Sequence, residues 1–514
     1  MASATRVVRN LYRDSVSLMQ LSNTLGALPG IEQASVVMAT EANIALLRAA
    51  GLARGTIEAS PNDLLIALQA KRADALEQAL QQAEAALKAE PAQPGGTEVA
   101  GEPPRSIQMA LAAEPAASLA LISTPGEYAA AEAEKALRSG LDVMLFSDNV
   151  SLEDEVALKN LARASGRIVM GPDCGTAIIH GVPLAFANVV RRGPIGCVAA
   201  SGTGLQQVTC LVDRLGLGIS QAIGTGSHDL HQAVGGITML AGIRALGGDP
   251  STKVIVLISK PPAPAVARTV LRAASRAGKP VVVNFVGAAP DSIRGANLYP
   301  VVTLEEAAQA AVALARGRKP APQRAPRLRV KRPRFAATQR YVRGLFSGGT
   351  FCYEASLLLG ERLGRVWSNA PLRAEDRLDD VWKSREHTLV DLGDDEFTRG
   401  RPHPMIDHRL RNERMVKEAA DPQTAVILFD VVLGHGAHAD PAAAMVPAIQ
   451  AARKRASAGR RVIAFVGSVC GTPADPQDLR RQEAALRAAG VTLAPSNAAA
   501  VRLAAHLVAG RSRT

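Results

Sequence analysis

The chain has 514 residues, too many for one hydrophobic core, so we expect several domains of roughly 100 to 200 residues each. Apolar residues make up 47% and charged residues 21%, as in ordinary folded soluble proteins, whereas aromatic residues make up only 3%. The formal net charge is +12, but rings for stacking bases are scarce and much of the basic excess lies in one segment, so we expect no nucleic-acid partner.

The cysteines indicate a reducing compartment. There are five, an odd number, and no two have C-x-x-C spacing. The first ten residues, MASATRVVRN, lack the apolar core of a signal peptide, and no run of about 18 uncharged apolar residues occurs. We therefore expect a cytoplasmic protein with reduced thiols and no membrane span.

Residues 1–105 predict a small α+β N-terminal domain with a helical arm. A strand-like RVVRNLY is followed by DSVSLMQLSNTLGAL, where Asp14 or Ser15 can cap a helix, and then by a turn and strand in PGIEQASVVMAT. From Ser60, apolar residues at helical spacing without glycine predict one long helix over 60–90.

Residues 106–192 predict a Rossmann-like domain. Short apolar strands alternate with helices, as in parallel βαβ units, and ligands of such sheets lie at the carboxyl ends of the strands. We take four residues at those ends as candidates for binding a substrate or a CoA-like ligand. They are Thr124, Asp173, Cys174 and Gly175. A nucleophilic role for Cys174 is the weaker interpretation, because no neighbouring base is evident.

The remaining sequence contains an internal repeat. Residues 194–216 and 341–364 each read as an apolar strand, a Ser-Gly turn and a helix, and two later strands of the first copy also recur in the same order. This predicts two flavodoxin-like domains over 193–316 and 340–514, joined by a basic, Pro- and Arg-rich linker at 317–339. Chance similarity between two Ala-rich α/β segments is the alternative.

The repeated turn predicts an anion site. Glycines allow backbone amides to approach a ligand, hydroxyl groups add donors, and a helix N-terminus carries a partial positive charge. The candidate phosphate-binding residues are Ser201, Gly202, Thr203 and Gly204 in the first copy, and Ser347, Gly348, Gly349 and Thr350 in the second. A tight strand-to-helix corner would need the same glycines. Neither a P-loop nor a G-x-G-x-x-G fingerprint is present.

The segment 391–408 lies inside an insertion of the second copy and is dense in acidic, basic and imidazole groups. Because function concentrates on such loops, we expect a substrate or interface role, with a solvated loop as the alternative. The candidate catalytic residues are Arg399, His403, Asp407 and His408. Two H-x-x-H pairs, His228/His231 and His435/His438, lack an evident third ligand, so we expect no metal site.

These motifs resemble succinyl-CoA synthetase. The run from 118 to about 315, with GPDCG at 171–175 and GCVAASGTG at 196–204, resembles the α subunit, and 341–510 resembles the CoA-ligase part of the β subunit. The resemblance implies that the Rossmann-like domain over 106–192 is of the CoA-binding type, and that two helices face one phosphate. An ATP-grasp domain has no room between the copies, and the loop where that family has its catalytic histidine, 288–300, contains none. We therefore expect no phosphohistidine relay from ATP in this chain alone.

With the segment GDDEFTRGRPHPMIDHR, the whole chain resembles the FdrA family. This resemblance implies a subunit of a carbamoyltransferase complex of ureide catabolism, in which oxalurate and phosphate give oxamate and carbamoyl phosphate. It also implies operon-encoded partner subunits and a homodimer or larger complex, with phosphate or carbamoyl phosphate as ligand and CoA left open. The alternatives are an acyl-CoA synthetase that works with a separate nucleotide-binding chain, and a non-catalytic scaffold.

Overall fold

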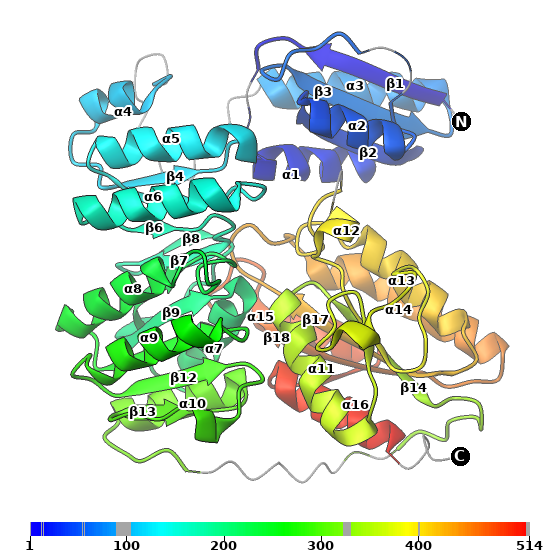
Figure 1. Ribbon diagram of the computed structural model, residues 1–514. Helices are drawn as coiled ribbons and strands as arrows, with labels where there is room; N and C mark the ends of the chain where they lie inside the picture. Colours follow the sequence, from blue (N-terminus) through cyan, green and yellow to red (C-terminus); the bar gives the residue numbers. More distant parts are fainter. Residues whose placement is uncertain are drawn as a thin grey trace. The chain divides into compact units, whose positions relative to one another are not determined.

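The computed structural model describes residues 2–11, 13, 15–53, 55, 57–88, 104–321, 330, 332–398 and 401–509. The chain forms two units, one of Met1–Ala117 with Asp395–Asp407, and one of Ser118–Asp394 with His408–Thr514 (Figure 1). The middle of the predicted 391–408 segment is therefore part of the small unit, although the residues on both sides of it belong to the large one. Arg399 and residues 322–329 of the predicted linker lie outside the described residues.

The small unit contains a three-stranded antiparallel sheet in the order β1-β3-β2. Helices α1 and α3 pack on one face of the sheet through residues such as Leu18 and Leu80, and α2 covers the other face through Ile44 and Leu47. The elements are β1 (Ala2–Val8), α1 (Ser15–Gly26), β2 (Ile31–Met38), α2 (Glu41–Ala49), β3 (Leu64–Ala70), α3 (Ala73–Lys88), α4 (Ile107–Ala113) and α12 (Asp395–Thr398). The predicted α+β class is confirmed.

The helix predicted from Ser60 is wrong over its first half. Leu64–Ala70 is the central strand β3, and helix α3 begins only at Ala73. Leu64, Leu65, Ile66, Ala67 and Leu68 have no exposed surface, because helices cover both faces of the sheet. Such a strand is apolar at every position, so its periodicity does not distinguish it from a buried helix.

The large unit begins with three parallel strands in the order β4-β5-β6. Its elements are β4 (Leu119–Ile122), α5 (Gly126–Arg138), β5 (Asp142–Leu145), α6 (Leu152–Ser165) and β6 (Val169–Met170). Ser151 caps α6, because its side chain accepts a hydrogen bond from the amide of Asp154, and Gly166 ends the helix in a left-handed conformation. The next hairpin, β7 (Thr176–Ile179) and β8 (Val182–Ala185), pairs with β10 of the following sheet. That sheet therefore starts about 17 residues before the expected boundary at 193.

The second sheet has the order β13-β12-β11-β9-β10-β7-β8, parallel except for the hairpin. Strand β9 (Arg192–Ala200) lies between β10 (Ile219–Gly224) and β11 (Val254–Ser259). The other elements are α7 (Gly202–Arg214), α8 (Ile237–Gly248), α9 (Pro264–Ser275), β12 (Val281–Phe285), β13 (Leu298–Pro300) and α10 (Leu304–Ala315).

The third sheet is wholly parallel, in the order β15-β16-β14-β17-β18-β19. Its first strand, β14 (Tyr341–Phe346), lies between β16 (Thr388–Asp391) and β17 (Thr424–Val432), as β9 lies between β10 and β11. The other elements are α11 (Gly349–Leu363), β15 (Trp367–Ser368), α13 (Arg409–Ala420), α14 (Pro441–Ala458), β18 (Ala464–Cys470), α15 (Leu479–Ala488), β19 (Val491–Ala494) and α16 (Asn497–Val508). The predicted duplicated α/β class is confirmed.

Helix α7 joins the two repeated domains. Every residue from Gly204 to Asp213 is buried, which is unusual for a helix on a sheet and reflects cover from both domains. At the end of the helix, Arg214 donates hydrogen bonds to the carbonyl oxygens of Val469 and Gly471 in the other domain. The N-terminus of α7 therefore lies at the interface of the two copies.

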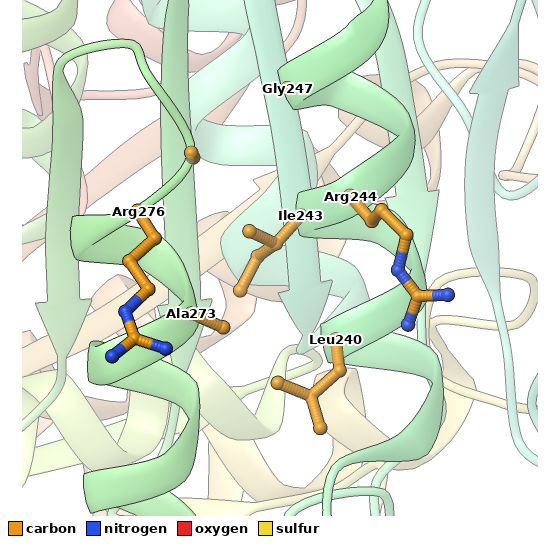
Figure 2. A pocket seen from close by; sticks show the side chains of 7 residues that line it. Leu240, Ile243, Arg244, Gly247, Ala273 and Arg276 are labelled. Atoms are coloured by element: carbon orange, nitrogen blue, oxygen red, sulfur yellow. The ribbon is translucent and has the colours of Figure 1, made fainter.

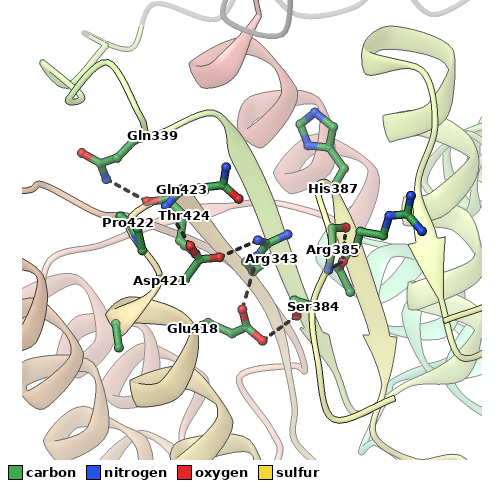
Figure 3. Close-up of polar contacts among 12 residues, drawn as sticks. Gln339, Arg343, Ser384, Arg385, His387, Glu418, Asp421, Pro422, Gln423 and Thr424 are labelled. Atoms are coloured by element: carbon green, nitrogen blue, oxygen red, sulfur yellow. Dashed lines mark hydrogen bonds and ion pairs between the residues drawn. The ribbon is translucent and has the colours of Figure 1, made fainter. Parts of the chain in front are cut away.

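A buried polar cluster lies at the amino ends of the strands of the third sheet (Figure 3). Arg343 on β14 pairs with Asp421 at 2.6 Å and with Glu418 at 3.3 Å, and Arg414 donates to the same Glu418 at 2.6 Å. Burial, followed by the Arg343 charge, lowers the pKa of His387 to about 4, so this imidazole is neutral. The cluster holds α13 against the sheet. It lies at the end of the sheet away from the carboxyl ends of the strands.

Candidate functional site

The two predicted Ser-Gly turns meet. Oγ of Ser201 lies 2.6 Å from Oγ1 of Thr350, and a Cβ atom on Gly348 would lie 2.9 Å from Oγ1 of Thr203. Each turn follows a strand that has neighbours on both sides, the position where parallel sheets bind ligands. The N-termini of α7 and α11 therefore converge on one place.

The first turn is accessible. The hydroxyl of Ser201 accepts a hydrogen bond from the amide of Gly204 at 3.0 Å and so caps α7. Gly202 is exposed, and Ser201 and Thr203 are partly exposed. Within the described part of the chain, the amides of Gly202 and Thr203 have no acceptor, so they remain available to an anion.

The second turn is already occupied by a side chain. The carboxylate of Asp430 on β17 accepts hydrogen bonds from the amide and hydroxyl of Ser347, both at 2.7 Å, and from the amide of Gly348 at 3.0 Å. Asp430 is fully buried and pairs with the equally buried Arg411 at 3.2 Å. Ser347 and Gly348 thus differ from the expectation, because their donors are satisfied inside the fold. Thr350 meets Ser201 of the other turn, and Gly349 is partly exposed beside it.

Two charged side chains that sequence reasoning did not assign complete the site. Asp391 ends β16 and is 7% exposed, and its Oδ2 lies 2.5 Å from the position of a Cβ atom on Gly349. Burial raises the pKa of Asp391 to about 6, and the nearby Lys260 opposes this rise. Lys260 directly follows β11 and is exposed, and its Nζ lies 5.8 Å from the ring centre of Tyr353 on α11. The available signal was their place at strand ends.

The candidate catalytic residues of the 391–408 segment belong to different units. His403 and Asp407 group with the small unit, where Nδ1 of His403 accepts a hydrogen bond from the amide of Met405 at 3.2 Å. His408 belongs to the large unit and is buried, and its Nδ1 lies 2.8 Å from Nη2 of Arg411. A guanidinium only donates, so Nδ1 of His408 is the acceptor. His408 therefore supports the Arg411–Asp430 pair behind the second turn.

The residues that follow strands β4, β5 and β6 also lie close together. The Ser147 hydroxyl donates to the carbonyl oxygen of Thr124, and the Asp173 amide donates to the carbonyl oxygen of Ser147 at 2.9 Å. Cys174 is buried, and burial raises the pKa of its thiol to about 12, so it is not a nucleophile at neutral pH. The Gly175 carbonyl accepts from the amide of Phe186. Of the four candidates for ligand binding, Asp173 is exposed.

The histidine pairs serve other contacts. Nδ1 of His228 lies 3.5 Å from Glu155, whose carboxylate also pairs with the fully buried Lys159. In the described part of the chain, no group of three metal-ligating side chains occurs. The same described residues contain no helix long and apolar enough to cross a membrane.

A surface hollow of about 400 Å³ lies between α8 and α9 (Figure 2). Arg244 and Arg276 border it, and apolar residues such as Leu240 and Ile243 form its floor. Because its lining includes no residue of the two turns, we assign it no part in the site.

Three segments match known families. Residues 345–507 match the CoA-ligase family, 191–287 match the CoA binding domain, and 1–103 match the AllF heavy metal-associated domain. Residues 1–103 contain neither cysteine nor histidine.

Individual relatives extend these matches. The uncharacterized protein YahF of Escherichia coli K12 is 44% identical over 493 residues, 95% of each chain. The α subunit of ADP-forming succinate–CoA ligase from Aquifex aeolicus is 29% identical over 172 residues, 32% of this chain and 55% of that subunit. A dinucleotide-forming acetyl-coenzyme A synthetase from Ca. Korarchaeum cryptofilum is 14% identical, with a TM-score of 0.32 over 77% of this chain and 83% of that one.

Fold, domain matches and duplicated turns define a succinyl-CoA synthetase-like protein of the CoA-ligase type. Within that class, the chain belongs to the family of YahF.

Proposed function

We propose that the chain is an enzyme subunit that forms or cleaves an acyl-phosphate bond where α7 and α11 meet. The contact of 2.6 Å between Ser201 and Thr350 carries this proposal. Two helix N-termini that converge offer oriented amides and hydroxyls to one oxyanion. An oriented phosphate and donors for the developing charge are what the formation of an acyl phosphate requires.

The charges around the turns favour one oxyanion rather than two. Asp430 already fills the second turn, and Arg411 neutralises Asp430 inside the fold. The exposed Lys260 supplies the positive charge that a phosphate would meet. We therefore place the phosphate at the open turn of α7, with Gly349 and Thr350 as contacts from α11.

Two reactions share this chemistry. The CoA-ligase and CoA-binding matches support an acid–thiol ligase, in which phosphate and an acyl-CoA interconvert with an acyl phosphate and CoA. A partner chain would then supply the nucleotide-binding part.

A carbamoyltransferase of the FdrA type is the second candidate, with oxalurate and phosphate giving oxamate and carbamoyl phosphate. Residues 288–300, all within the described chain, contain no histidine, and β11 ends in Ser259 followed by Lys260. A site without the phosphohistidine fits a reaction that needs no relay from ATP. Arg399, His403 and Asp407 remain candidates for holding the substrate or a partner.

The deciding experiment assays the chain alone and with the proteins encoded beside it. One arm supplies carbamoyl phosphate with oxamate and measures oxalurate; the other supplies acyl-CoA with phosphate and traps acyl phosphate with hydroxylamine. Product in either arm that disappears in the Ser201→Ala/Thr350→Val variant supports the site. Product at unchanged rate in that variant would overturn it. The matched control is Gly360→Ala on α11, where an added Cβ meets nothing within 4 Å.

A further inference from the structure

Asp391 presents one carboxylate oxygen to the converging helix termini. Its Oδ1 accepts a hydrogen bond from the amide of Gly393 at 3.0 Å, whereas Oδ2 lies against Gly349 and accepts none from the described residues. The side chain of Asn369 holds the Asp391 backbone from both sides, with its Oδ1 2.9 Å from the amide and its Nδ2 3.0 Å from the carbonyl oxygen. The carboxylate is thus buried, fixed and open on the side of the first turn of α11.

The groups facing Asp391 come from four elements. Among the charges that act on it, Lys260 after β11 is positive, and Asp394 on its own loop and Asp430 on β17 are negative. From α11, it faces Gly349 and the buried thiol of Cys352. A dianion in contact with Gly349 would add negative charge on the side of α11 that this carboxylate faces.

We propose that Asp391 is the proton-transfer residue of this site and carries a proton whenever an oxyanion lies at the open turn of α7 in contact with Gly349 and Thr350. The proposal rests on the function given above. Burial raises the pKa of Asp391 to about 6 in the free chain. A dianion beside it disfavours the ionised form further, so binding draws a proton onto Asp391 at neutral pH.

The proton balance is the same for both candidate reactions. The phosphate oxygen forms a bond to the carbonyl carbon, and the bond from that carbon to the leaving nitrogen or sulfur breaks. Asp391 gives its proton to the leaving atom and takes the proton of the attacking hydrogen phosphate. Asp391 ends protonated as it began, and no other reactant is needed.

Calorimetry with sulfate tests the proposal, because sulfate does not titrate near neutral pH. Titrations of the full chain at mildly alkaline pH, in buffers of different ionisation enthalpy, should show uptake of up to about one proton per sulfate bound. The Asp391→Asn variant should bind sulfate at least as tightly and take up no proton. The matched control, Asp394→Asn on the same loop, should keep the uptake.

The outcomes separate the two claims. Sulfate binding without proton uptake, or equal uptake by Asp391→Asn, would overturn the role of Asp391 and leave the proposed function standing. Absence of both sulfate and phosphate binding would remove the site and the proposed function together. In the assembled enzyme, Asp391→Asn should lower turnover by about 10²- to 10⁴-fold without weakening phosphate binding.

Discussion

The two Ser-Gly turns have nearly the same sequence but different surroundings. Ser201 opens a turn that is accessible and caps its own helix, whereas Ser347 opens a turn that is buried and bonded to Asp430. Strand pairing explains the difference, because Ala200 pairs with Ser259 on β11, and the equivalent place on β17 holds Asp430. One residue on the neighbouring strand therefore decides whether a helix N-terminus is open to a ligand or filled from within.

The largest expected effect comes from removing the buried carboxylate of Asp430. Asp430→Ala leaves the Arg411 charge buried without its partner, which should cost about 3 to 5 kcal/mol of unfolding free energy. Urea denaturation followed by circular dichroism measures it. Ser201→Ala in the first turn should lose only about 1 kcal/mol, the usual value of an N-cap. Equal losses would mean that the two turns do not differ in the way described.

Asp391 gives a pH-dependent effect of intermediate size. Its pKa is raised from 3.8 to about 6 in the fold, so the folded state holds the proton more tightly, and stability should fall as pH rises from about 4 through about 6. Asp391→Asn removes this decline and should be more stable above that window by up to about 3 kcal/mol, while differing little below it. Denaturation at a series of pH values measures this difference in stability. The same pH dependence of stability in both proteins would contradict a raised pKa of Asp391.

Replacing Ser347 should mainly lower stability, whereas replacing Ser201 should mainly weaken phosphate binding. Ser347→Ala removes a buried donor from Asp430 and should cost about 1 to 3 kcal/mol of stability with unchanged phosphate affinity. Ser201→Ala should cost less stability but weaken phosphate binding by roughly 10-fold, because its hydroxyl lies at the open turn. Thermal denaturation and phosphate calorimetry on both variants test these opposite effects on stability and affinity. A loss of affinity in Ser347→Ala alone would reverse our assignment of the open turn.

The smallest expected effect concerns Cys174. Because the buried thiol does not ionise near neutral pH, Cys174→Ala should leave turnover of the assembled enzyme unchanged within about twofold. Stability should fall by about 1 kcal/mol through lost packing. A large loss of turnover with the fold intact would show that the 171–175 turn takes part in the chemistry.

The sequence predicts the duplicated fold and the place of the two turns, because strand, turn and helix are local patterns that occur twice. It does not predict which charged groups face the turns. Asp391 ends β16, Lys260 follows β11 and Asp430 lies within β17, and only the strand order brings them together. The course of residues 395–407 into the small unit likewise leaves no local pattern. The strand at Leu64–Ala70 was mistaken for helix because it is buried on both faces.

The most direct test of the central claim compares two lysines at opposite ends of one strand. Lys253 precedes β11 and Lys260 follows it, and both are exposed. Calorimetric titration with phosphate should show roughly 10- to 100-fold weaker binding in Lys260→Ala, since a charge-assisted hydrogen bond is lost, and unchanged binding in Lys253→Ala. Equal affinities in the two variants would contradict a phosphate site where α7 and α11 meet.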